Sequence, residues 1–151
     1  GILNEWAVSN AYISYSVVEA GTSSATIANA EDGQWYLQTK GYNHEFDLSQ
    51  TITGLEIGST YTGSYYINVQ LSFLELGGCW NYAYLDSTSA ANQIYYEQFS
   101  TSAAYNYWQK HSFTFTAASS THDVIYSFDC GSSYGGSQWY IGWDNFELPA
   151  Y

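Results

Sequence analysis

Residues 61–70 read Tyr-Thr-Gly-Ser-Tyr-Tyr-Ile-Asn-Val-Gln, and the stretch alternates between two kinds of side chain. One set is apolar or aromatic and the other is polar or aromatic: Tyr61, Gly63, Tyr65, Ile67 and Val69 against Thr62, Ser64, Tyr66, Asn68 and Gln70. A period of two is typical of a strand with one face on a core and the other face outside. The stretch therefore predicts a long strand, placed centrally in a sheet.

The same period of two recurs along the rest of the chain. It covers residues 7–19, 34–39, 45–53, 80–86, 93–99, 108–116, 123–129 and 138–148. Turn clusters rich in Gly and Ser separate these stretches, and no segment shows a helical stripe with caps. We therefore expect an all-β fold of eight or nine strands, an antiparallel β-sandwich of the jelly-roll type.

Length and charge limit the classes of partner. A chain of 151 residues is of the usual size for one domain, so residues 1–151 are interpreted as a single β-sandwich domain. The formal net charge of −12 repels nucleic-acid phosphates and anionic lipids, and no apolar run approaches the roughly 20 residues of a membrane span. We expect neither nucleic acid nor a membrane as partner.

The chain holds 17 Tyr and 6 Trp but only two basic residues, far more ring surface than a small core needs. Such rings suit the stacking surface of a sugar, with amides to bind its hydroxyls. Strand parity places Trp80, Tyr82 and Tyr84 on one face of their strand. Beside this row we expect Tyr66, Asn68 and Gln70 from the preceding strand, with Trp139 from the closing strand. These seven residues form the candidate carbohydrate site. The alternative is that these rings only pair across strands and fill the core. Trp6, Trp35 and Trp108 are expected in the core or at its rim.

The two cysteines, Cys79 and Cys130, lack the spacing of a zinc or redox motif. They predict one disulfide, worth roughly 4 kcal/mol in the chain-entropy model, if the compartment is oxidising. Two buried free thiols are the alternative.

Three stretches together resemble a known family. They are 48–66, which reads Leu-Ser-Gln-Thr-Ile-Thr-Gly-Leu-Glu-Ile-Gly-Ser-Thr-Tyr-Thr-Gly-Ser-Tyr-Tyr; 108–115, Trp-Gln-Lys-His-Ser-Phe-Thr-Phe; and 142–148, Gly-Trp-Asp-Asn-Phe-Glu-Leu. In this order they are similar to the carbohydrate-binding modules of the family 4/9 type, especially the fungal secreted forms. The resemblance implies a jelly roll with a sugar-binding cleft on its concave face, in a secreted or cell-surface protein.

The same resemblance implies one structural calcium ion, whose ligands here would come from Glu31, Asp32 and Asp144. Members of that family open with a strand carrying a Phe-Glu pair, and this sequence begins at a point after that pair. We therefore expect the family's first strand, and one acidic ligand with it, to be missing, although calcium prefers six to eight oxygens.

Three functions follow as hypotheses. The leading one is non-catalytic binding of a neutral cell-wall polysaccharide such as β-glucan or xylan. The second is a self-assembling structural or adhesive protein, in which an open sheet edge accepts a neighbour's strand. The third is a small jelly-roll hydrolase or lyase, for which the candidate groups are Ser133 with His122 and Asp123, and the acid pairs Glu45 with Asp47 and Asp86 with Glu97.

Overall fold

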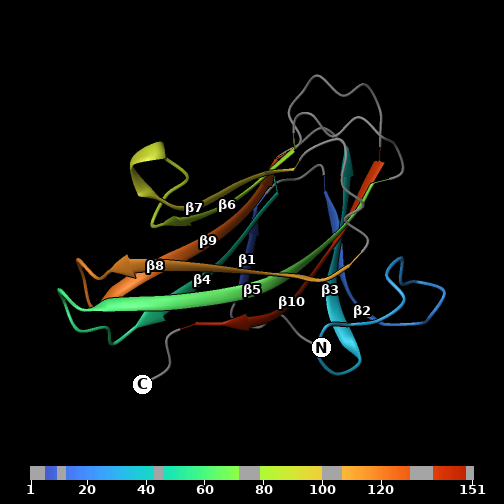
Figure 1. The fold of residues 1–151 in the computed structure, drawn as a ribbon, viewed down its shortest axis with the longest axis horizontal. Coiled ribbons are helices and arrows are strands. Elements are labelled where there is room, and N and C mark those ends of the chain that lie inside the picture. Colours follow the sequence, from blue (N-terminus) through green and yellow to red (C-terminus); the bar gives the residue numbers. More distant parts are fainter. Residues whose placement is uncertain are drawn as a thin grey trace.

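The computed structural model describes residues 6–9, 13–42, 46–71, 79–99, 107–129 and 138–148. They form two antiparallel five-stranded sheets packed face to face (Figure 1). The first sheet has the order β1 (Trp6–Ser9), β4 (Phe46–Thr53), β9 (Thr121–Asp129), β6 (Cys79–Leu85) and β7 (Gln93–Phe99). The second has the order β2 (Ser14–Glu19), β3 (Trp35–Tyr42), β10 (Gln138–Glu147), β5 (Thr60–Leu71) and β8 (Gln109–Thr116), and a 3₁₀ turn, η1 (Ala90–Asn92), precedes β7.

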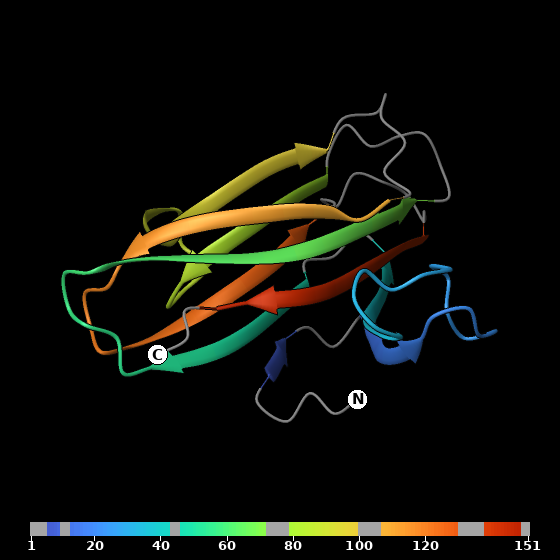
Figure 2. The same ribbon diagram turned by 60° about the horizontal axis from the view of Figure 1, so that its bottom comes forward.

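The predicted antiparallel β-sandwich is confirmed, with one error in the strand boundaries. Residues 7–19, predicted as one strand, form β1 and β2, which lie at the edges of different sheets (Figure 2). The chain passes from one layer to the other between them, and Ile13 is buried just before β2. A period of two continues across such a crossing, so the pattern alone does not reveal it.

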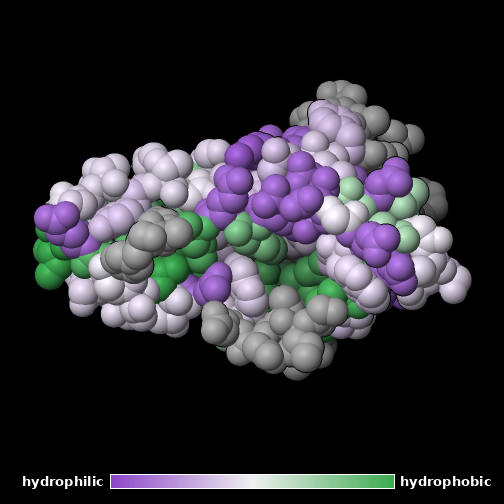
Figure 3. Space-filling view, turned by 90° about the horizontal axis from the view of Figure 1, so that it is seen from below, coloured by the Kyte–Doolittle hydropathy of each residue, from purple (hydrophilic) through white to green (hydrophobic). Residues whose placement is uncertain are grey.

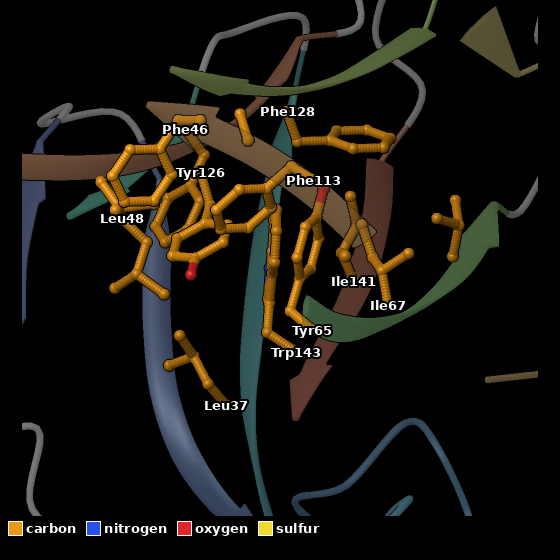
Figure 4. Packing of buried hydrophobic residues seen from close by; sticks show 14 of the residues in the cluster. Leu37, Phe46, Leu48, Tyr65, Ile67, Phe113, Tyr126, Phe128, Ile141 and Trp143 are labelled. Atoms are coloured by element: carbon orange, nitrogen blue, oxygen red, sulfur yellow. The ribbon is translucent and has the colours of Figure 1, made fainter. Parts of the chain in front are cut away.

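The alternation in residues 61–70 places one set of side chains in the core, as predicted. Tyr65, Ile67 and Val69 are buried between the sheets with Phe46, Leu48, Tyr126 and Trp143 (Figure 4). Trp143 donates its Nε1–H to Thr39 Oγ1 at 3.1 Å, so the polar edge of this buried ring is satisfied. Tyr66, Asn68 and Gln70 consequently lie on the outer face of the second sheet.

Cys79 opens β6 and is buried. It is not a free thiol in the structure, and Cys130, the residue after β9, lies outside the described residues. The predicted pairing of the two cysteines therefore stays a prediction. None of the helical structure in the described ranges is long and apolar enough to cross a membrane.

A polar group interrupts the core between the edge strands β7 and β8. His111 is only 4% exposed, with Nδ1 at 2.8 Å from the Tyr95 hydroxyl and 3.0 Å from Glu97 Oε2, whereas its Nε2 has no partner. Burial lowers the pKa of His111 below its usual value, and the nearby Glu97 carboxylate only partly opposes this shift.

This shift predicts a loss of stability in mild acid. Because the folded state binds the His111 proton more weakly than the unfolded chain, stability is complete above the unfolded pKa of about 6.5 and falls as the pH drops below it, by at most about 1.4 kcal/mol per pH unit for one proton. Urea unfolding at several pH values between 5 and 8 measures the slope. In His111→Gln the slope should be smaller, and an unchanged slope would rule out His111 as its source.

Candidate functional site

The outer face of the second sheet carries two transverse rows of residues that the strand register places side by side. One row joins Gln38, Gly142 and Asn68, and the next joins Lys40, Tyr140 and Gln70. Because each row crosses β3, β10 and β5, this face presents polar side chains, one ring and one glycine over the three central strands.

The segment between β2 and β3 folds over part of this face. Ile27 packs with Val18 and Tyr36 in a second, small hydrophobic cluster outside the main core. The Tyr36 hydroxyl accepts the backbone N–H of Ile27 at 3.0 Å, and Gln38 Oε1 accepts that of Thr26 at 2.7 Å. These contacts hold the segment against β3, so it forms a fixed wall on the sheet.

Asp144 on β10 ties the far part of the same segment to the sheet. Its Oδ2 accepts the backbone N–H groups of Glu31 at 2.9 Å and Asp32 at 3.1 Å, and Asn145 donates a side-chain N–H to Glu31 Oε2 at 3.0 Å. Burial raises the pKa of Asp144, and the backbone donors work against that shift.

The three predicted calcium ligands thus lie together, but not as a metal site. Both lone pairs of Asp144 Oδ2 are used by backbone N–H groups, and the described residues contain no group of three or more His, Cys, Asp or Glu arranged to hold a metal ion. Glu31 and Asp144 oxygens are thus engaged by protein donors, and calcium binding by Glu31, Asp32 and Asp144 stays a prediction.

Trp108 forms the second wall, just before β8. Its indole Nε1–H donates to the Asn29 carbonyl at 2.8 Å, and its ring meets Tyr36 edge-on at 5.7 Å. Gly142 lets the ring approach the sheet, because a Cβ at that position would lie 2.6 Å from Trp108 Cη2. The indole is therefore fixed before any ligand arrives.

Between these walls lies a groove of about 310 Å³, lined by Ile27, Ala28, Asn29, Asn68, Gln70, Tyr107 and Trp108. Tyr107 at its rim is 58% exposed. Asn68 is only 3% exposed, yet its Oδ1 has no hydrogen-bond partner. A buried amide oxygen without a partner is costly, so it marks a position where a ligand donor would be stabilised.

The groove lies away from the most exposed aliphatic side chain of the described residues. Ile57, in the turn between β4 and β5, is 67% exposed, and Figure 3 shows hydrophobic colour at that end of the sandwich. Figures 1 and 2 place the segment between β2 and β3 at the opposite end. The groove, which is lined by rings and amides, is therefore separate from the hydrophobic surface at the Ile57 end of the sandwich.

Trp80, Tyr82 and Tyr84 share one face of β6, as predicted, and it is the outer face of the first sheet. The rings of Tyr82 and Tyr84 stack on each other at 5.4 Å, and Tyr82 also meets Tyr96 across the strands at 5.5 Å. Tyr82 thus pairs across strands with Tyr96, whereas Tyr84 stacks on Tyr82 within β6, and a role of these rings in sugar binding stays a prediction.

The prediction that Tyr66, Asn68 and Gln70 lie beside the Trp80 row is wrong. Strand β5 belongs to the second sheet and β6 to the first, so the two sets lie on opposite outer faces of the sandwich. Asn68 and Gln70 line the groove, whereas Tyr66 lies further along β5, where Lys110 Nζ sits 5.6 Å from its ring centroid. The side chain of Trp139 lies outside the described part of the chain.

Sequence reasoning missed Tyr107 and Trp108 as groove residues. One signal could have found Trp108: Gly142 interrupts the closing strand, and a glycine inside a strand often marks the close approach of another group. Trp6 packs at the edge of the core against Phe146, as expected. Trp35 is 47% exposed, and its place at the rim stays a prediction.

Among the candidate catalytic groups, His122 and Asp123 do not form the expected pair. His122 Nδ1 pairs with Asp86 at 2.8 Å rather than with Asp123, and its Nε2 accepts the backbone N–H groups of Ala118 and Ser119. The ring therefore organises the turn between β8 and β9 and has no free nitrogen for a substrate proton. Ser133 and Glu45 lie outside the described residues.

No family model matches the sequence, and no curated protein matches it. Solved structures do match its fold. A carbohydrate-binding module of the β-sandwich superfamily aligns with a TM-score of 0.63 at 12% identity, over 99% of this chain and 59% of that chain. The chain thus spans less than two thirds of that protein's length.

Two further structures are similar over nearly full length. The CBM22-1 xylan-binding domain of Xyn10C from Paenibacillus barcinonensis has a TM-score of 0.61 at 14% identity and covers 98% of this chain and 86% of that chain. A cyclase from Fischerella sp. TAU has a TM-score of 0.62 at 13% identity, covering 95% and 83%. At these identities the likeness shows the β-sandwich fold, which binding modules and an enzyme share.

Proposed function

We propose that the chain binds carbohydrate without catalysing a reaction, and that the groove on the outer face of the second sheet is the binding site. The observation that carries this proposal is the groove itself, in which the amides of Asn68 and Gln70 lie beside the rings of Tyr107 and Trp108. Asn68 Oδ1 is buried there without a partner, and a sugar hydroxyl that reaches it after a turn of the Asn68 side chain would remove the cost of the unsatisfied oxygen.

The groove walls supply the second requirement, a stacking surface. Trp108 is held by the Asn29 carbonyl and by its contact with Tyr36, whereas Tyr107 is exposed beside it. A ring fixed in advance loses little conformational entropy on binding, so the groove is preorganised for an apolar sugar face. Gln70 adds a second amide on the same floor.

Several finer features remain part of the proposal. The ligand is a cell-wall polysaccharide such as β-glucan or xylan, and the protein is a secreted relative of the family 4/9 modules whose Cys79 pairs with Cys130. The similarity in fold to a xylan-binding domain supports this choice of ligand. Calcium binding and self-association through a sheet edge stay hypotheses.

Affinity electrophoresis through gels containing soluble β-glucan, xylan or mannan tests the proposal. We expect at least one polymer to retard the folded protein, and we expect no reducing sugar to be released from it. If neither these neutral polymers nor an acidic one such as glucuronoxylan slows a protein with native circular dichroism, the binding function is wrong. Light scattering of the same sample reports self-association: a clean monomer at high concentration removes the assembly hypothesis.

A further inference from the structure

The groove differs in charge from the rest of the protein. The chain carries 14 Asp and Glu residues against two Lys, yet none of the acidic residues in the described ranges lines the groove. Both lysines, Lys40 and Lys110, lie on the outer face of the second sheet, the face that carries the groove. Both Lys side chains of this strongly acidic protein therefore lie on the same face as the groove.

The two lysines differ in their partners. Lys110 Nζ lies 3.0 Å from Glu147 Oε2, and that carboxylate also accepts the Ser64 hydroxyl. Lys40 makes no ion pair with any residue of the described ranges, and its Nζ sits 5.4 Å from the Tyr140 ring centroid. Glu147 therefore neutralises the positive charge of Lys110, whereas no residue of the described ranges neutralises that of Lys40.

The strand register connects Lys40 to the groove. Lys40, Tyr140 and Gln70 are direct neighbours in one row across β3, β10 and β5, and Gln70 lines the groove. A chain molecule that leaves the groove along this row passes the Tyr140 ring and reaches the ammonium group. Asp144, an acid on the same strand as Tyr140, is engaged by the backbone N–H groups of Glu31 and Asp32.

We infer that the polysaccharide bound in the groove carries uronic-acid carboxylates, and that Lys40 is the residue that recognises them. This inference rests on the proposed carbohydrate-binding function and changes one point of it: the polymer is acidic rather than neutral. An ammonium next to a carboxylate contributes modestly and is screened by salt, and the net charge of −12 repels a densely charged polymer. The contact therefore sets a preference for a polymer with sparse carboxylates and does not supply the whole affinity.

The test compares each acidic polymer with its own carboxyl-reduced form, which keeps the backbone and removes the charge. Glucuronoxylan, polygalacturonate and alginate serve as probes for isothermal titration at low salt. We expect the wild-type chain to prefer at least one acidic polymer about three- to fivefold over its reduced form, and the preference to disappear in 1 M NaCl.

Lys40→Gln should abolish this preference and still bind the reduced polymer as the wild type does. Lys110→Gln is the matched control, because it removes the same charge from the same face and should keep the preference. If the wild type binds both forms equally, or if Lys40→Gln keeps the preference, the inference is overturned while carbohydrate binding stands. If no acidic, reduced or neutral polymer binds the folded chain, the proposed function itself fails.

Discussion

Replacement of Asn68 by Ala is expected to lower the affinity for the bound polysaccharide about tenfold or more, while changing the free energy of unfolding by less than about 1 kcal/mol. The affinity falls because the variant loses the groove acceptor, and a buried hydrogen bond of this kind is worth about 1–3 kcal/mol to the complex. Stability changes little because Asn68 Oδ1 is already without a partner in the free protein. Titration calorimetry and urea unfolding measure the two effects.

Asn81→Ala is the matched control for this variant. Asn81 is also a buried asparagine, but it faces the core, where its Oδ1 accepts the Tyr65 hydroxyl at 2.9 Å. Its replacement should cost about 1–3 kcal/mol of stability and leave the affinity unchanged. Equal losses of affinity in both variants would mean that Asn68 acts through stability and not through the groove.

Gly142→Ala is expected to damage the groove and the fold together. The new Cβ would lie 2.5 Å from Ile27 Cδ1 and 2.6 Å from Trp108 Cη2, so both groove walls must move. Overpacking of this kind typically costs about 1–3 kcal/mol, and the displaced indole should lower the affinity about tenfold. Tryptophan fluorescence, urea unfolding and calorimetry report the three effects.

Gly63→Ala separates the two consequences. A Cβ there would overlap the Phe113 ring on the core side of β5, whereas the groove lies on the outer face of that sheet. We expect a similar loss of stability with an unchanged affinity for the polysaccharide. Normal binding by Gly142→Ala would contradict the position assigned to Trp108.

Much of the fold could be predicted because the period of two is strong. The parity of residues 61–70 correctly separated Tyr65 and Ile67 in the core from Asn68 and Gln70 outside. The same parity correctly put Trp80 and Tyr82 on one face of β6. Parity assigns a face within one strand, and that local rule needs no knowledge of the other strands.

What parity could not supply is the sheet to which each strand belongs. Residues 61–70 and 80–86 follow each other closely in the sequence, which suggested one shared surface, yet β5 and β6 lie in different layers. Consecutive strands of a sandwich often change sheets, so an outer face of one strand says nothing about the outer face of the next.

The walls of the groove were equally hidden from the sequence. They come from a long connection at residues 20–34 and from Trp108 before a strand, and neither follows a regular period. Their positions depend on hydrogen bonds to Tyr36, Gln38 and Asp144, which join residues distant in the sequence. Such contacts become visible only in the folded chain.

The most direct test of the central claim, that the groove and not the aromatic row on the first sheet holds the sugar, is a ¹H–¹⁵N NMR titration with the oligosaccharide of a retarding polymer. We predict shifts in the side-chain amides of Asn68 and Gln70 and in the Trp108 indole N–H, with the Trp80 indole and the Gln98 amide unchanged. Shifts confined to Trp80 and Gln98, on the outer face of the first sheet, would contradict the account.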